Sequence, residues 1–288
     1  AEALARRGQL EQALQQLEQA MQLDTKSALP PLLEGRILAA RGQYPAAEQA
    51  LTAALARMPP AQPLLDRVGA LVALTEARLA QGKVAAAAQS QTSLAAVAPG
   101  APITQLLAGR IDLARGNLSG GISQLEKVLA RAPDLLAARL YLGAAELSQG
   151  NLQQAQQQLE QVVQASPDNV AARKLLASVR LRLGEPEAAL SALTPALESQ
   201  PADPGVLSLI GAASRGTGDS RSAVEALESQ LKTHSKDEAA ALNLAQLQAA
   251  TGDLVAAKST LSAALATHPD ALPLRLALAK VELAHGDV

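Results

Sequence analysis

The feature that most constrains this chain is a set of nine glycines that recur at an almost constant spacing. Seven of the eight intervals between them are 34 residues long and one is 40, for Gly8, Gly42, Gly82, Gly116, Gly150, Gly184, Gly218, Gly252 and Gly286. Each of the first eight of these glycines precedes a stretch of helix-forming residues. A fixed period of this length is typical of a repeat architecture, in which each unit packs only against its neighbours.

Three further positions recur with the glycines. A small residue stands five residues after each one, and leucine stands nine after in seven of eight cases, with Gln91 as the exception. Proline usually stands seventeen after. Glycine lets the backbone turn sharply between two helices, the small residue allows them to approach closely, and proline ends the second helix. The pattern therefore predicts antiparallel helix pairs stacked into a solenoid.

Composition supports an all-α fold and excludes several other classes. The chain has 288 residues, a formal net charge of −2, no Cys, Phe or Trp, and two tyrosines, Tyr44 and Tyr141. Without Cys there is no disulfide framework or thiolate metal site. Nearly neutral charge argues against nucleic acid as a partner, and no apolar run is long enough to form a transmembrane segment.

The repeat resembles the tetratricopeptide repeat (TPR) family along the whole chain. One unit carries most of the family pattern in Leu142-Gly143, Gly150-Asn151-Leu152, Ala155, Leu159 and Pro167. The resemblance implies an all-α, right-handed superhelical solenoid of antiparallel helix pairs, and we predict one such solenoid over 1–288, as a fragment of a longer protein. Its full repeats are 28–61, 68–101, 102–135, 136–169, 170–203, 204–237 and 238–271, with half repeats at 1–27 and 272–288. Residues 62–67 are an insertion expected to lengthen a first helix.

No catalytic motif stands out, so we predict neither an enzyme nor a bound cofactor. His234 and His268 lie one repeat apart and suggest a pair of metal ligands at first sight. Equivalent atoms of stacked helices are about 10 Å apart, too far to share one zinc ion. We therefore favour a structural role at helix ends and predict no metal site.

The resemblance implies that ligands bind in a concave groove lined by the first helix of each repeat. The positions two, six and thirteen residues before each turn glycine are the expected lining. Most are small, and the charged ones are mainly basic. The candidate groove residues there or nearby are Arg36, Glu76, Arg110, Lys174, Arg182, Arg215, Gln246 and Lys280. We predict a mildly positive groove for proteins or extended peptides, or for an anionic polysaccharide.

A narrower resemblance concerns the segment RKLLASVRLRLGEPEAAL at 173–190, with NLQQA at 151–155 and PDN at 167–169. It looks similar to the TPR lipoproteins of bacterial PEP-CTERM/exosortase systems. That resemblance implies a scaffold in the periplasm or anchored to the outer membrane, linked to exopolysaccharide production and export.

Two alternatives stay open at the level of sequence. A generic cytoplasmic TPR adaptor would hold a peptide carboxylate with clustered Lys and Asn, but Lys174, Arg182 and Asn243 are scattered. The recognition arm of a larger enzyme, such as a protein glycosyltransferase, would resemble its relatives in an asparagine ladder. The equivalent places here hold mainly apolar residues, such as Leu107 and Leu175, which argues against that alternative.

Overall fold

We analysed a computed structural model, which describes residues 10–59, 64–200, 203–217 and 238–286, and single positions at 224, 228 and 231. Within these residues the secondary structure is entirely helical, which confirms the all-α prediction. The helices of the first half are α2 (Leu10–Leu23), α3 (Leu29–Ala40), α4 (Tyr44–Arg57), α5 (Leu64–Ala80), α6 (Val84–Val97), α7 (Pro102–Ala114), α8 (Leu118–Arg131) and α9 (Leu136–Gln149). Those of the second half are α10 (Leu152–Ala165), α11 (Val170–Leu183), α12 (Pro186–Ser199), α13 (Pro204–Thr217), α15 (Glu238–Ala250), α16 (Leu254–Thr267) and α17 (Leu272–His285).

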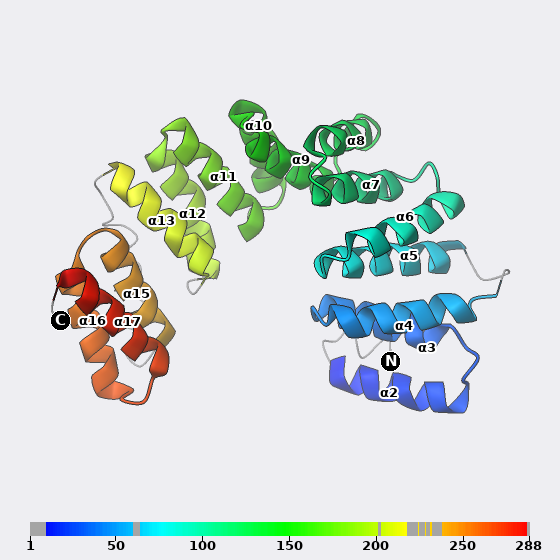
Figure 1. The fold of residues 1–288 in the computed structure, drawn as a ribbon, viewed down its shortest axis with the longest axis horizontal. Helices are drawn as coiled ribbons and strands as arrows, with labels where there is room; N and C mark the ends of the chain where they lie inside the picture. Colours follow the sequence, from blue (N-terminus) through cyan, green and yellow to red (C-terminus); the bar gives the residue numbers. More distant parts are fainter. Residues whose placement is uncertain are drawn as a thin grey trace. The chain divides into compact units, whose positions relative to one another are not determined.

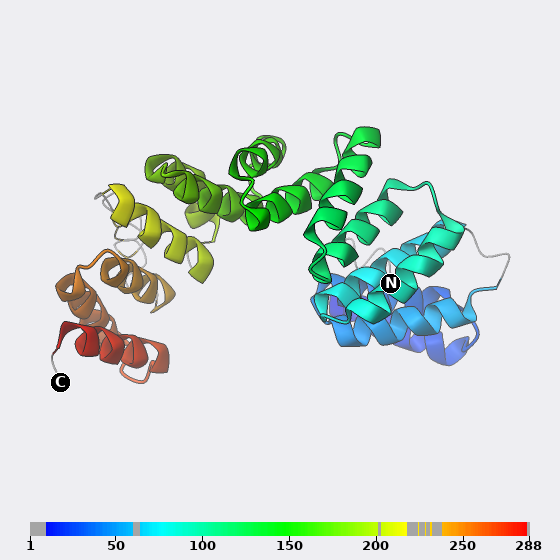
Figure 2. The same cartoon turned by 45° about the horizontal axis from the view of Figure 1, so that its top comes forward.

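The chain divides into two compact units, the first ending at Ala145 and the second beginning at Glu146. We call them unit 1 and unit 2. Inside each unit consecutive helices pack as pairs, for example α3 with α4 and α15 with α16 (Figure 1). Figure 2 shows the same pairs in a second view. The first helices of successive pairs also touch, as α3 touches α5 and α15 touches α17. The extent of the solenoid, its handedness and the repeat boundaries stay predictions.

The turn glycines adopt the conformation that the period predicts. Seven of them have φ between 70° and 92°, a region that favours glycine, while Gly8 and Gly218 lie outside the described residues. At the first six of these turns the N–H after the glycine bonds back to a carbonyl five residues earlier, as from Asn151 to Glu146 at 2.9 Å. This bond closes the helix end and fixes where the next helix starts.

The second helices end two residues before the recurring proline. Helices α4, α6, α8, α10 and α16 stop at Arg57, Val97, Arg131, Ala165 and Thr267, ahead of Pro59, Pro99, Pro133, Pro167 and Pro269. Residues before proline disfavour the helical conformation, so the proline sets the end of the pair. The expected insertion at 62–67 precedes and enters α5, which has 17 residues against 13 in α7. Gln62 and Pro63 lie outside the described residues.

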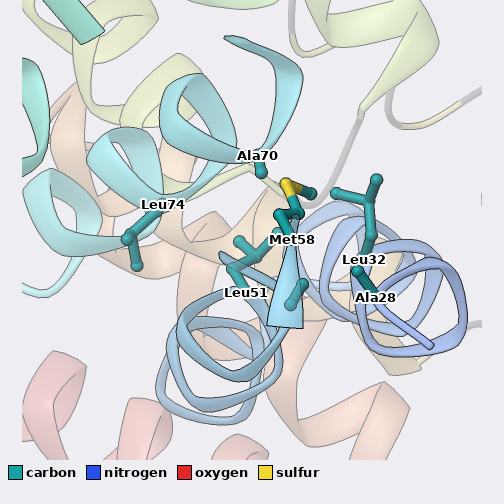
Figure 3. Close-up of a cluster of buried hydrophobic side chains, with 7 residues drawn as sticks. Ala28, Leu32, Leu51, Met58, Ala70 and Leu74 are labelled. Carbon is teal, nitrogen blue, oxygen red and sulfur yellow. The ribbon is translucent and has the colours of Figure 1, made fainter. Parts of the chain in front are cut away.

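The core of each pair forms from the other two repeating positions. Ala47, Ala155 and Ala257, five residues after a turn glycine, are fully buried, and so are Leu51, Leu125 and Leu261, nine residues after. Figure 3 shows Leu51 of α4 among side chains of α3 and α5, including Leu32 and Leu74. In the one unit with Gln91 instead of leucine, the fully buried residue is Leu94, three positions further on.

Candidate ligand-binding cavities

Three of the predicted groove residues meet at one cavity in unit 1. Arg36, Glu76 and Arg110 each stand six residues before a turn glycine, on the first helices α3, α5 and α7. The cavity measures about 420 Å³ and is lined by Arg36, Ala39, Ala40, Tyr44, Ala73, Glu76, Ala77, Ala80, Arg110 and Tyr141. We call it the polar cavity. Ala40 and Ala80, two residues before their turn glycines, are also among the positions that the sequence predicts.

Arg110 is held in place by two neighbours. Its Nη1 donates to Oε1 of Glu76 at 3.1 Å, and its Cζ lies 4.5 Å from the centre of the Tyr141 ring. The Arg110 side chain is 17% exposed, whereas that of Glu76 is 48% exposed. A guanidinium that is fixed by a carboxylate on one side and an aromatic face on another loses little freedom when it binds a ligand.

Arg36 is the other cation of the polar cavity, and its surroundings differ. Its side chain is exposed, and it has neither a hydrogen-bond nor an ion-pair partner among the residues that the structure describes. It therefore keeps its donors available to a ligand. Both arginines lie on first helices, one repeat away from Glu76 on either side.

Sequence reasoning did not place the two tyrosines in the candidate site, yet both line the polar cavity. Tyr44 starts α4 and packs beside buried Leu38 and Ala77. Tyr141 lies on α9 and packs against the core that contains Leu106 and Leu142. The composition held a usable signal, because these are the only aromatic residues in the chain.

Gln246 and Lys280 meet at a second cavity, in unit 2. Both also stand six residues before a turn glycine, on the first helices α15 and α17, and both are exposed. The cavity measures about 480 Å³ and is lined by Leu242, Ala245, Gln246, Ala249, Leu261, Pro273, Leu276, Ala277, Lys280 and Val281. We call it the apolar cavity, since eight of its ten lining residues carry apolar side chains.

Of the remaining predicted groove residues, Lys174 and Arg182 line neither the polar nor the apolar cavity. Lys174 on α11 donates to Oδ2 of Asp203 at 2.9 Å, and this lysine is the main reason that the pKa of Asp203 lies below its usual range. Nη1 of Arg182 donates to the carbonyl of Leu147 at 2.7 Å. Both cations are thus engaged within unit 2. Arg215 belongs to α13, and its side chain lies outside what the structure describes.

Ion pairs whose members line neither the polar nor the apolar cavity also link neighbouring helices. Glu48 on α4 accepts from Nζ of Lys83 at 2.7 Å and from Nε of Arg78 at 2.9 Å. The hydrogen bond from Lys83 leads the interactions that lower the pKa of Glu48, with Arg78 and Gln81 adding to it. In unit 2 Arg180 pairs with Glu160 at 3.0 Å. Charged first helices are therefore used for packing as well as for lining cavities.

The described residues contain no cluster of three or more His, Asp or Glu side chains that could hold a metal ion. Of the predicted histidine pair, His268 caps the end of α16, and its Nδ1 lies 2.9 Å from Oγ1 of Thr267. His234 lies outside the described residues. None of the helices in the described part of the chain is long and apolar enough to cross a membrane.

Comparison with known proteins identifies the repeat. The sequence profile of the family described as tetratricopeptide repeat matches residues 112–162, 146–213 and 215–281, which together exceed half of the chain. No curated protein matches the sequence.

Solved structures show the same fold. A chain in the crystal structure of the APC/C hetero-tetramer Cut9–Hcn1 is 14% identical, with a TM-score of 0.64 over 97% of this chain and 48% of that one. A tetratricopeptide repeat protein from Parabacteroides merdae is 17% identical, with a TM-score of 0.51 over 89% of this chain and 98% of that one. The chain spans about half the length of the first of these. Its solenoid-type helix pairs and the family match agree, and the chain belongs to the tetratricopeptide repeat family.

Proposed function

We propose that this chain is a non-enzymatic scaffold that binds extended segments of partner proteins along its first helices. One observation carries the proposal: residues at the same repeat position on three consecutive first helices, Arg36, Glu76 and Arg110, line one open cavity. An extended peptide can contact several repeats at once, because it presents side chains at regular intervals to such a surface.

Site-specific photo-crosslinking in the cell of origin tests this function. A photo-reactive amino acid at Ala73 probes the polar cavity, and one at Ala277 probes the apolar cavity. Gln49 is the matched control, because it is exposed on the second helix α4 and lines neither described cavity. We expect crosslinks to proteins from Ala73 or Ala277 that are missing from Gln49. Equal crosslinking from all three positions, or none from the two cavities, would refute the scaffold function.

We further propose that the scaffold works in the bacterial cell envelope, in a system linked to exopolysaccharide production and export. The support is the resemblance of 173–190 and its flanking motifs to TPR lipoproteins of PEP-CTERM/exosortase systems. Fractionation of the full-length protein from its own cells, with metabolic labelling by a fatty acid, is the test. We expect a labelled protein in the envelope fraction. An unlabelled protein in the cytoplasmic fraction would instead support the adaptor alternative.

A further inference from the structure

We propose that the polar cavity of unit 1 recognises the side-chain carboxylate of an acidic residue within an extended peptide. This inference rests on the scaffold function proposed above and specifies which peptides the first helices of unit 1 select. Its basis is the set of side chains that line this cavity: two arginines, one glutamate and both tyrosines of the chain, together with five alanines.

The charge of the polar cavity suits a ligand with a single negative charge. Arg36 and Arg110 contribute two positive charges and Glu76 one negative charge, which leaves a formal charge of +1. A carboxylate neutralises that charge, and Arg–carboxylate pairs form strong hydrogen bonds in two-pronged geometry. A phosphorylated residue carries about −1.5 to −2 and would overcompensate it. The volume of about 420 Å³ lies within the roughly 300–1,000 Å³ of ordinary ligand pockets.

The two arginines contribute to recognition in different ways, because only one of them is held in place before the ligand binds. Arg110 is already fixed between Glu76 and the Tyr141 ring, so the ligand meets a guanidinium whose ordering cost is largely met before binding. Arg36 is exposed and without a partner among the described residues, so it can turn onto the incoming carboxylate. Removing the positive charge of Arg36 should therefore weaken binding without disturbing a packed contact.

The surroundings of Tyr141 favour a peptide over a sugar polymer. Sugar rings bind to open aromatic faces, but one side of the Tyr141 ring is occupied by Arg110, and the residue packs against the core around Leu106 and Leu142. Tyr44 is half-buried beside Leu38 and Ala77. The two tyrosines thus line the cavity with a partly buried ring and a polar hydroxyl group. Tyrosine commonly has this role in protein interfaces.

The test is an array of blocked nine-residue peptides with a central Glu and varied neighbours, beside the same peptides with central Gln. We expect the purified chain to be retained at least tenfold more strongly by the best Glu peptides than by their Gln partners. Arg36→Gln should lose at least tenfold of that retention. Arg131→Gln is the matched control, because Arg131 is also an exposed arginine of unit 1 but lies on the second helix α8 and lines neither cavity. It should leave retention unchanged.

Tyrosine fluorescence gives a second readout that reports directly on the cavity. The chain has no Trp, and its only two tyrosines both line the polar cavity. The best Glu peptide should change this fluorescence in a saturable way, and its Gln partner should not. The same titration is repeated with an oligogalacturonate and with peptides whose only carboxylate is a free C-terminus. These two ligands are the other possible sources of a carboxylate.

Three results would overturn the proposal. They are equal retention of Glu and Gln peptides, unchanged retention by Arg36→Gln, and a fluorescence response only to the sugar or to the free C-terminus. The scaffold function would survive any of these if crosslinks from Ala277 persist, since that position probes the apolar cavity alone. Loss of crosslinks from both cavities would instead remove the scaffold function itself.

Discussion

The two cavities occupy equivalent places in the repeat and yet differ in chemistry. Both are lined by residues that stand six and nine residues before turn glycines, on first helices that follow one another along the chain. In unit 1 the positions six before the glycine carry Arg36, Glu76 and Arg110, and the wider lining is alanine and tyrosine. In unit 2 the corresponding Gln246 and Lys280 border leucines and a proline.

This difference distinguishes two sets of positions in the repeat. One set, which we call the frame, consists of the turn glycine, the small residue five positions later and the leucine nine positions later; the other set lines the cavities. The turn glycine, the small residue after it and the buried leucine recur in both units, so they set the helix pairs and not the ligand. The position six residues before the glycine differs between repeats, and the five residues there that line a cavity are Arg36, Glu76, Arg110, Gln246 and Lys280. A single repeat architecture can therefore present an ionic site in one unit and an apolar surface in the other.

The largest effect should come from the shared frame. Leu125 in unit 1 and Leu261 in unit 2 occupy the same repeat position and are fully buried. Truncating either to alanine should lower the free energy of unfolding by about 2–5 kcal/mol. The cost for Leu261→Ala should be the smaller, because Leu261 borders the apolar cavity and the space it leaves adjoins an existing opening. Urea unfolding followed by circular dichroism measures the loss, and hydrogen exchange assigns it to a unit.

Leu272→Ala is the control for that experiment, since Leu272 is 64% exposed. Its effect should stay within about 0.5 kcal/mol, as for most surface substitutions. If Leu272→Ala were as costly as Leu125→Ala, burial at the repeating leucine would not be what holds the helix pairs together.

A smaller effect on stability should distinguish the two units at the position five residues after the turn glycine, where two helices approach closely. Unit 1 has Gly121 there, and a Cβ on it would lie 2.4 Å from Cδ2 of Leu113 and 3.1 Å from the carbonyl oxygen of Gly109. Gly121→Ala should therefore cost about 1–3 kcal/mol through overpacking, which exceeds the gain of about 0.5–1 kcal/mol in helix propensity and leaves the variant less stable. Unit 2 has the fully buried Ala257 at the same position.

The reverse change, Ala257→Gly, should cost about 0.5–1 kcal/mol through helix propensity, beyond any loss of packing. Both variants are compared by urea midpoint. A stabilising Gly121→Ala would mean that α7 and α8 can separate without loss, and the tight packing of this pair would then be unimportant.

The frame was predictable from sequence because its signals are local and repeated. Glycine conformation, proline at helix ends and buried leucine each follow from one residue at one repeat position, and eight copies average out exceptions such as Gln91. The candidate site was only partly predictable. The position six before the glycine holds Arg36, Glu76 and Arg110, which line the polar cavity, and Gln246 and Lys280, which line the apolar cavity.

The rest of the candidate site depends on side-chain contacts that no period encodes. Lys174 and Arg182 occupy first-helix positions, but each reaches a partner in its own unit, Asp203 and the carbonyl of Leu147. Sequence spacing cannot distinguish an arginine that faces a ligand from one that spans to the neighbouring helix, because both have long side chains on the same helix face. Tyr44 lies outside the first-helix pattern altogether.

Filling either cavity with a larger side chain should change the free energy of unfolding only modestly. The effect on the binding of acidic peptides should differ between the two cavities. Ala73 and Ala277 each stand nine residues before a turn glycine and line the polar and the apolar cavity respectively. Ala277→Leu adds apolar surface beside Leu276 and Val281, so it should change stability by no more than about 1 kcal/mol. Ala73→Leu should abolish the retention of acidic peptides, which Ala277→Leu leaves intact.

Peptide retention and thermal unfolding are both measured on the two variants. Retention that survives Ala73→Leu would show that the acidic peptide binds elsewhere on unit 1 or on unit 2. The contrast between the cavities would then be one of surface composition without a consequence for binding.

The smallest effect concerns how acid weakens each unit. The pKa of Glu48 lies below its ordinary 4.5, chiefly through the hydrogen bond from Lys83, and that of Asp203 below its ordinary 3.8, chiefly through Lys174. A carboxyl whose pKa is lower in the folded state contributes stability that is complete above its ordinary pKa and is lost as pH falls through the folded value. Unit 1 should thus begin to lose this contribution below about pH 4.5, and unit 2 only below about pH 3.8.

The pKa of Glu34 in unit 1 is shifted in the opposite direction, so this residue provides an internal check. Burial, and then the charge of Glu18, raise its pKa, so the folded state pays a penalty that develops as pH rises from 4.5 through the raised value. Glu34→Gln should therefore raise the urea midpoint at pH 7 and leave it nearly unchanged at pH 3. Glu48→Gln should lower the midpoint at pH 7 and come closer to wild type as the pH falls below 4.5, because protonation of Glu48 progressively removes the same interaction. Parallel pH profiles for the two variants would contradict the assignment of opposite roles to these two carboxylates of unit 1.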